Sequence, residues 1–430
     1  MMHSWLRFTA IEYSKPTAIP EQFLRGSGIK NGQIQNLVLS AAERVRRLLK
    51  LETLPISLTA DRFQFQDFAG LLTLAPGLEL EVAPKFLGNT SGWREDFFFL
   101  ATLSHHGRLL DDEGLKSAAH PASDLGTLIG RSLVEMYWRN QRRPLRTYRH
   151  RREREFAIEG EFDAEDLLYP DEEGFRQQIT SFTRSNPYNA VIGAAATELA
   201  TVVPDIETRA RLERLAQHLP RQVRPMQVEQ RKLPSRSRPW QATYDLSCDI
   251  MRGLGGVYDP KDALAPGFVM QTWRAWEHLV SLALRMIFGG RKVSLQSRHR
   301  LGTRQQGSLT TDLCVIPDVI VVDDSTDPVR RVLVDAKYKG RIDANSFAIS
   351  NADIYEALAF AGAAKIRDVI LAYPCRLVGE LSEDHMAGYV SEFSTIKVDG
   401  ISIKAVELGV CGISKRGGLM RFANALAKII

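Results

Sequence analysis

Two apolar runs near the C-terminal end of the chain, residues 316–322 and 331–339, are joined by the polar segment 323–328. β-Branched residues favour strands, and Asp, Ser and Pro favour chain reversal, so the pattern predicts an antiparallel hairpin. Asp318 and Asp335 lie symmetrically about its midpoint. In a regular hairpin they stand opposite each other, and Lys337, two residues further along one strand, points to the same face.

Two carboxylates beside an ammonium group are typical of a metal-dependent nuclease site. Mg²⁺ takes oxygen ligands, often one or two carboxylates, and keeps other positions for water and phosphate oxygens. Asp318 and Asp335 fit the ligand role, and Lys337 fits a role in orienting the attacking water or stabilising the anionic transition state. Asp-x-Lys alone is weak evidence, because Asp259–Lys261 repeats it in a loop and a solvated strand end gives the same pattern.

The segments around this hairpin are also patterned. Residues 268–288 place apolar side chains at helical spacing and predict a helix with Glu277 on its apolar face. A buried Glu277 needs a partner, which the metal site would supply, whereas a glutamate at the edge of the apolar face would reach solvent or Arg274. Residues 351–360 predict a second helix and residues 368–374 a strand. The expected order is helix, hairpin, helix, strand.

These motifs together resemble the McrC family, the nuclease subunit of modification-dependent McrBC restriction systems. The resemblance covers most of the chain and rests on short motifs in the family's order. They are Glu81–Lys85, Asn189, Trp276-Glu277, Pro317-Asp318, Asp335–Tyr338, Asp353–Tyr355 and Tyr373-Pro374. The likeness implies a C-terminal PD-(D/E)xK nuclease domain with Asp318, Asp335 and Lys337 as its core and Glu277 as the helical acidic residue. Glu356 stands where many relatives carry glutamine, and would add a metal contact or weaken the approach of DNA.

A mixed α/β fold in three parts is expected. The parts are a β-rich domain at 1–115, a helical basic region with a connector at 116–260 and the nuclease domain at 261–430. Within the first, residues 72–82 predict a hairpin with one wet face. The pattern favours a structural role for this hairpin, whereas the resemblance implies that the N-terminal part engages the ring of a motor protein.

Eight arginines against one glutamate mark the segment from Arg139 to Arg154. Arginine matches phosphate geometry, so contact with the DNA backbone is one interpretation, with Arg142, Arg143, Arg146 and Arg149 as candidates. A solvated face or an acidic protein partner would leave the same pattern. The net charge of +5 is too small to decide between them.

Composition narrows the class of protein further. At 430 residues with 44% hydrophobic residues, the chain can form two or three domains, and its four scattered cysteines suggest neither a zinc site nor a disulfide framework. No run approaches a membrane span, so a cytoplasmic protein is expected. A Gly-x-x-x-x-Gly-Lys-Ser/Thr loop is also absent from the sequence. We therefore expect no nucleotide on this chain.

Two functions follow from these observations. The first is a subunit that cleaves double-stranded DNA with Mg²⁺, or Mn²⁺, and whose partner, by the resemblance, is an AAA+ GTPase of McrB type. The second is a non-catalytic adaptor that binds and stimulates a motor NTPase. The complete set of Asp318, Asp335, Lys337 and Glu277 favours the first.

Overall fold

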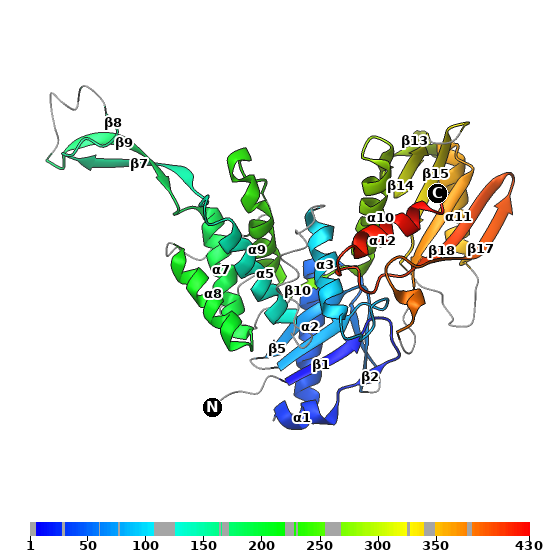
Figure 1. The fold of residues 1–430 in the computed structure, drawn as a ribbon, viewed down its shortest axis with the longest axis horizontal. Coiled ribbons are helices and arrows are strands. Elements are labelled where there is room, and N and C mark those ends of the chain that lie inside the picture. Colours follow the sequence, from blue (N-terminus) through cyan, green and yellow to red (C-terminus); the bar gives the residue numbers. More distant parts are fainter. Residues whose placement is uncertain are drawn as a thin grey trace. The chain divides into compact units, whose positions relative to one another are not determined.

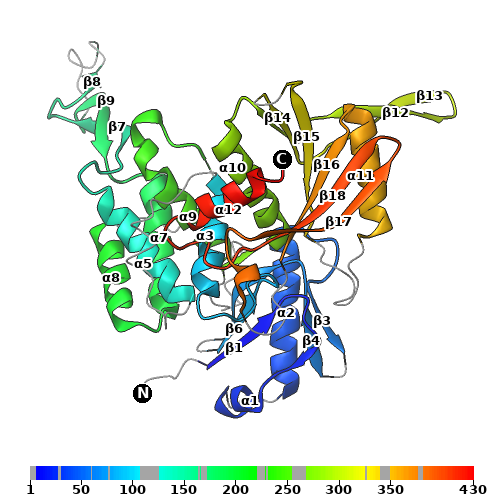
Figure 2. The same ribbon diagram turned by 45° about the vertical axis from the view of Figure 1, so that its right-hand side comes forward.

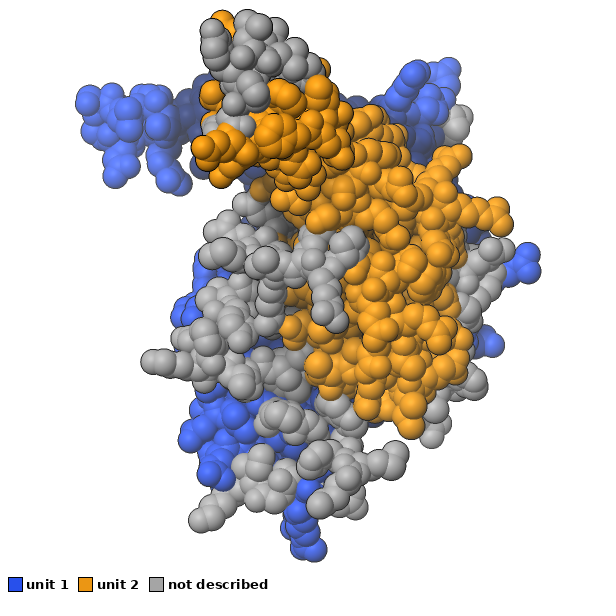
Figure 3. Space-filling model, turned by 90° about the vertical axis from the view of Figure 1, so that its left-hand side faces the viewer, with its two compact units in different colours: residues 1–125, 269–430 blue, residues 126–268 orange. Residues whose placement is uncertain are grey.

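The chain folds into two compact units in a computed structural model. Unit 1 combines residues 1–125 with 269–430, and unit 2 is residues 126–268 (Figures 1 and 3). Helices and strands are mixed throughout, which confirms the α/β class, while the three-part division stays a prediction. The structure describes residues 6–27, 31–59, 61–75, 78–106, 125–162, 165, 172–219, 228, 231–253, 268–324, 327–338, 349–375 and 381–430. Within these ranges, no helix has both the length and the apolar character needed to cross a membrane.

In the described residues, the N-terminal part of unit 1 contains two small sheets and three helices. One sheet has the strand order β1-β6-β5-β10 and the other β2-β4-β3. Their shared core is rich in phenylalanine, with Phe8, Phe63 and Phe65 almost fully buried. The elements are β1 (Leu6–Ile11), β2 (Thr17–Ala18), α1 (Glu21–Ser27), α2 (Asn31–Leu49), β3 (Ile56–Thr59), β4 (Arg62–Phe65), β5 (Ala69–Ala75), β6 (Leu78–Ala83), α3 (Trp93–His106) and β10 (Phe268–Met270).

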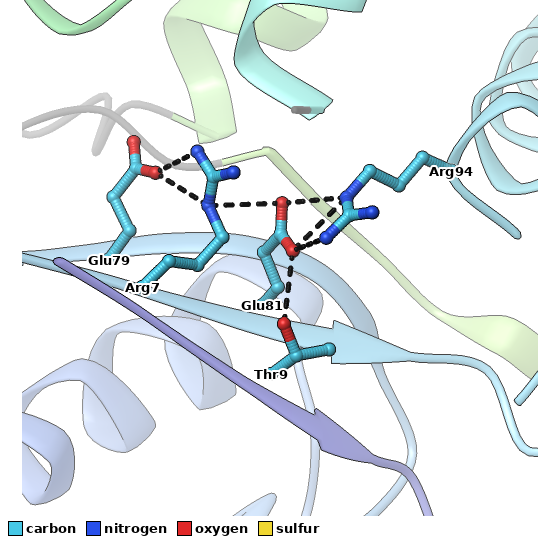
Figure 4. A network of polar contacts seen from close by, with 5 residues as sticks. All are labelled: Arg7, Thr9, Glu79, Glu81 and Arg94. Atoms are coloured by element: carbon cyan, nitrogen blue, oxygen red, sulfur yellow. Dashed lines mark hydrogen bonds and ion pairs between the residues drawn. The ribbon is translucent and has the colours of Figure 1, made fainter. Parts of the chain in front are cut away.

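The prediction that the β5–β6 hairpin has one wet face is wrong. All six residues of β6 are buried, including Glu79 and Glu81. Parallel pairing with β1 sets Arg7 beside Glu79, 2.7 Å apart, and Arg94 of α3 lies 2.6 Å from Glu81 (Figure 4). The alternation of charged and apolar residues is therefore misleading, because arginines from outside the hairpin, one on β1 and one on α3, cover the carboxylates. The turn residues 76 and 77 lie outside the described residues.

A six-stranded mixed sheet forms the C-terminal part of unit 1, in the order β11-β14-β15-β16-β18-β17. Antiparallel β14 and β15 lead into parallel β16, and α11 forms the connection between β15 and β16. The elements are α10 (Thr272–Phe288), β11 (Val293–Leu295), β12 (His299–Gln306), β13 (Leu309–Val315), β14 (Val319–Asp323), β15 (Arg330–Ala336), α11 (Asn351–Ala364), β16 (Asp368–Pro374), η2 (Glu383–His385), β17 (Val390–Val398), β18 (Ile401–Leu408) and α12 (Gly418–Ala427).

The hairpin predicted from the apolar runs is confirmed as β14 and β15, with Val319 paired to Val334. The next helix is confirmed as α11 and the next strand as β16. The upstream helix is confirmed as α10, but it begins at Thr272, because residues 268–270 form the edge strand β10.

Unit 2 combines a group of helices with a long three-stranded ribbon in the order β7-β9-β8 (Figure 1). The eight arginines were assigned to a mostly helical region, yet four of them lie on β7 itself. The prediction missed this strand because β7 pairs with β9 along nine residues that begin twenty residues further on. The elements are α5 (Leu125–Arg139), β7 (Thr147–Glu155), β8 (Glu161–Phe162), β9 (Phe175–Thr183), α7 (Pro187–Val202), α8 (Ile206–His218), η1 (Ser235–Trp240) and α9 (Gln241–Gly253).

Asn189, in the first turn of α7, holds the base of this ribbon. Its buried side-chain amide donates to the carbonyl of Leu145, just before β7, at 2.8 Å and to that of Arg184, just after β9, at 2.7 Å. Asn186 caps the helix and also donates to Leu145. Both strands are thus fixed to the helical part of unit 2.

The buried pair of Glu81 and Arg94 gives a test of what stabilises unit 1. Arg94→Met removes the closest cation from a carboxylate that is 0% exposed, so we expect the free energy of unfolding to fall by about 3 kcal/mol. Arg25→Met is the control, because Arg25 pairs with Glu21 on an exposed helical surface and should cost less than about 0.5 kcal/mol. Urea denaturation measures both. Equal losses in the two variants would contradict the assignment.

Candidate active site

Asp318 and Asp335 meet where β14 begins and β15 ends. The register that pairs Val319 with Val334 sets Asp318 opposite Asp335, as counting along the sequence predicts. The Asp318 carboxylate also accepts a hydrogen bond of 2.9 Å from the backbone N–H of Ala336. Asp335 is 3% exposed and Asp318 is half-buried. The two carboxylates are therefore held by the backbone of one hairpin.

Lys337 joins this pair from the end of β15. Its ammonium lies 2.7 Å from Oδ2 of Asp335 and 2.6 Å from Oε2 of Glu356 on α11. Its backbone N–H donates to the carbonyl of Ala372 on β16, which also accepts the indole N–H of Trp276 at 3.0 Å. Lys337 is thus fixed through its main chain as well as its side chain.

Glu277 follows Trp276 directly on α10, and its side chain is half-buried. It accepts a hydrogen bond of 2.7 Å from the side chain of Gln296, whose own backbone N–H donates to the carbonyl of Asp318. Gln296 has φ of 44°, a left-handed conformation that aims both groups toward the site. Sequence reasoning missed Gln296, since a glutamine in a loop carries no motif.

Burial changes the protonation of the acidic pair. Desolvation, together with the charge of Asp318, raises the pKa of Asp335 to about 7 and outweighs the opposing effect of Lys337. Burial also raises the pKa of Asp318, and Glu277 adds to the increase. For Lys337, desolvation acts downward, but Asp335 and Glu356 together hold its pKa above the ordinary value. The lysine is therefore charged at neutral pH.

The residues fit a divalent cation bound by two carboxylates. Oδ2 of Asp335 is buried and accepts no hydrogen bond of acceptable geometry, although Lys337 is close. Such an oxygen can serve as a metal ligand, and Mg²⁺ commonly uses only one or two carboxylates from the protein. Within the described part of the chain, His, Cys, Asp and Glu do not form any group of three or more suited to metal binding. Glu277 therefore stands near the pair without completing a third ligand position.

A buried polar cluster connects this site to the N-terminal sheets. Glu12, which is 0% exposed, accepts hydrogen bonds from the hydroxyls of Thr272, at 2.6 Å, and Tyr338. Lys85 donates to the carbonyl of Tyr338, and its ammonium lies 3.9 Å from the centre of the Tyr338 ring. Tyr338 follows Lys337 directly, and Thr272 begins the helix that carries Glu277. Sequence reasoning placed Lys85 in a motif but gave it no contact.

The remaining candidates lie apart from the acidic pair or outside the described residues. On α11, Asp353 accepts a hydrogen bond of 2.9 Å from the hydroxyl of buried Tyr373. The second Asp-x-Lys, Asp259–Lys261, lies outside the described residues. Arg142, Arg143, Arg146 and Arg149 belong to unit 2 and are exposed.

The fold and the site together define a mixed α/β protein in which a hairpin of a mixed sheet carries two paired carboxylates. A family model described as McrBC 5-methylcytosine restriction system component matches residues 63–374, and the chain belongs to this family.

Similar solved structures come from Thermococcus gammatolerans. A refined half-complex from a tetradecameric assembly of McrB AAA+ hexamers with bound McrC is 14% identical, covers 99% of this chain and 100% of that chain, and has a TM-score of 0.68. A cryo-EM structure of the McrBC complex is 14% identical, covers 65% of this chain and 87% of that chain, and has a TM-score of 0.51. At this identity they establish the fold. A search of curated proteins gave no match.

Burial of Glu12 makes the free energy of unfolding of the protein depend on pH. Burial raises the pKa of Glu12 to about 7 from an ordinary 4.5, so the folded protein holds this proton more tightly than the unfolded chain does. The resulting stability is present below pH 4.5 and is lost as the pH rises through about 7. Glu12→Gln is neutral at every pH, so the wild type should lose free energy of unfolding relative to this variant across that window. A difference that stays constant from pH 4.5 to 8, measured by urea denaturation, would refute the assignment.

Proposed function

We propose that this chain is the DNA endonuclease subunit of an McrBC-like restriction complex, with a PD-(D/E)xK site that hydrolyses phosphodiester bonds in the presence of Mg²⁺, or Mn²⁺. The observation that carries the proposal is the register of β14 and β15. It sets Asp318 opposite Asp335 and brings the Lys337 ammonium within 2.7 Å of the second carboxylate. Membership of the McrBC family supports the restriction context.

Asp318 and Asp335 would hold the metal ion. When bound, Mg²⁺ acts as a Lewis acid on the scissile phosphate and lowers the pKa of its water. Lys337 supplies a fixed positive charge beside the carboxylates, which stabilises negative charge that develops on phosphate oxygens and orients a water molecule. Gln296 holds Glu277, so the second acidic side chain near Asp318 keeps a defined orientation. Glu356 restrains Lys337 until DNA phosphate competes for the ammonium.

The motor that drives cleavage is proposed to be a separate AAA+ GTPase of McrB type. The sequence has no nucleotide-binding loop, and the structurally similar McrC is described as bound to McrB AAA+ hexamers. This arrangement would make the cleavage of DNA depend on nucleotide hydrolysis by the partner. The adaptor function is the alternative, in which partner stimulation occurs without catalysis by this chain.

The exposed arginines of unit 2 are proposed to contact DNA phosphates. All eight are exposed, and a hollow of about 490 Å³ on the ribbon is lined by Arg152, Arg154 and Arg176 together with two glutamates, Glu153 and Glu161. At the ribbon base, Tyr148 and Phe182 form an exposed aromatic pair 5.1 Å apart, with the Arg236 guanidinium within 5 Å of both rings. Guanidinium groups match phosphate geometry.

Two substitutions separate the roles at the active site. Asp335→Asn should abolish DNA cleavage by the reconstituted complex and weaken Mg²⁺ or Mn²⁺ binding at least tenfold by calorimetry, because it removes a charged ligand. Lys337→Met should reduce cleavage at least 100-fold and leave metal binding within about threefold, because the lysine is not a ligand. Partner assembly and nucleotide hydrolysis should stay unchanged in both. Persistent cleavage in both variants would favour the adaptor function.

Charge reversal tests the arginines of unit 2. Arg142→Glu/Arg146→Glu/Arg149→Glu should lower DNA affinity. It should also reduce the slope of log affinity against log salt by about 2 to 3, because binding releases about one counterion fewer for each phosphate contact that is lost. Arg211→Glu/Arg214→Glu is a control that reverses two exposed charges on α8, one of them paired with Glu207. Partner assembly is measured in parallel. Unchanged affinity and salt slope, with assembly lost, would assign the cluster to a protein partner.

A further inference from the structure

A two-stranded ribbon, β12 and β13, extends from the active-site sheet of unit 1 (Figure 2). Seven residue pairs form its ladder, and no third strand joins it in the described part of the chain. Most of its side chains are exposed on both faces, and Leu309 is 64% exposed. A two-stranded hairpin without a packed face is at best marginally stable in water. Apart from its contacts with α11, the ribbon packs against little else, so packing alone does not account for its side chains.

Both ends of the ribbon start at the candidate active site. β13 ends at Val315, three residues before Asp318. β12 begins at His299, three residues after Gln296, which bonds to Glu277 and to the backbone of Asp318. A ligand bound to the ribbon would therefore be held at a defined position relative to the two carboxylates.

The ribbon side chains are suited to a polyanion with polar edges. Arginine, glutamine and threonine make up seven of the fifteen strand residues, and the single acidic residue, Asp312, is paired with Arg300 at 3.0 Å. The register sets Arg304 opposite Thr311 and Gln306 opposite Leu309, so these side chains share one face. Arginine and glutamine make bidentate contacts with phosphates and base edges, and an exposed leucine suits the thymine methyl group.

Exposure on both faces distinguishes a ribbon that enters a groove from a sheet that docks on a surface. The DNA major groove, about 12 Å wide, admits a two-stranded β-ribbon. At roughly 3.4 Å per residue, seven ladder pairs reach on the order of 20 Å from the ribbon base, which spans about six base pairs of DNA. The ribbon is thus long enough to hold duplex DNA on one side of the cutting position.

We propose that the β12–β13 ribbon lies in a groove of double-stranded DNA and sets which phosphodiester bond reaches Asp318 and Asp335. This inference rests on the proposed endonuclease function. It assigns the groove contact to Arg304, Gln306 and Thr311, with Leu309 at the tip.

A shortened ribbon tests the proposal in the full complex with its motor partner. Residues 304–311 are replaced by Asn-Gly, which joins the directly paired Thr303 and Asp312 through a two-residue turn and keeps the base intact. Lys397→Ala, an exposed cation on the opposite edge strand β17, is the control. DNA affinity is measured in the Asp335→Asn background, and cleavage positions are mapped in the active protein.

The shortened ribbon should lower DNA affinity at least tenfold and spread the cleavage positions, while Mg²⁺ affinity stays within twofold of the wild type. The control should change neither. If the unaltered complex cuts DNA and the shortened one cuts at the same rate and positions with the same affinity, the ribbon proposal is overturned and the endonuclease function stands. If the unaltered complex does not cut DNA, the proposed function fails, and the ribbon proposal fails with it.

Photocrosslinking tests the contact between the ribbon and DNA even if the shortened ribbon destabilises the protein. A photoreactive amino acid replaces Arg304, or Lys397 as the control, in the otherwise intact chain. Crosslinks from position 304 to duplex DNA, without crosslinks from position 397, support the proposal. Crosslinks from position 304 to the motor protein, or to neither, overturn it.

Discussion

The structure of unit 1 depends on one buried polar cluster around Tyr338. The Tyr338 hydroxyl donates to Glu12, its carbonyl accepts from Lys85, and its ring faces the Lys85 ammonium. Burying a carboxylate and an ammonium without partners would cost several kcal/mol each, so these groups must satisfy one another. The residue that follows Lys337 is thereby fixed by the N-terminal part of the chain, and the position of Lys337 depends on that part.

Three further hydrogen bonds hold the other elements of the site in place. Thr272 binds Glu12 and begins the helix that carries Glu277, while Trp276 and Lys337 share the carbonyl of Ala372. Main-chain and buried contacts therefore hold together the helix, the hairpin and the parallel strand that carry the site residues. Such rigidity suits a proposed site in which metal ligands and an ammonium must be held in place before the substrate arrives.

Local pairing could be predicted from the sequence, but distant pairing could not. The register of Asp318 with Asp335 follows from counting, because the two strands are adjacent in sequence and their apolar residues fix the pairing. Glu12 and Tyr338 are 326 residues apart, and Lys85 and Tyr338 are 253 apart, and no local pattern specifies such pairs. Glu79 and Glu81 show the same limit, since only the fold reveals the arginines that cover them. The β7 strand escaped prediction because its partner strand follows a long intervening segment.

Charged side chains are paired in the interior of unit 1 but exposed to water on the β7–β9 and β12–β13 ribbons. Inside unit 1, Glu79, Glu81 and Glu12 each lie against a cation or hydroxyl donors from another element. The arginines of β7 and Arg304 of β12 instead face water on strands that bury little surface of their own. Folding alone gives no reason to keep guanidinium groups at these places, because exposed charges add little stability. A polyanionic partner does give one, and duplex DNA would bring the same partner to both ribbons and to the paired carboxylates.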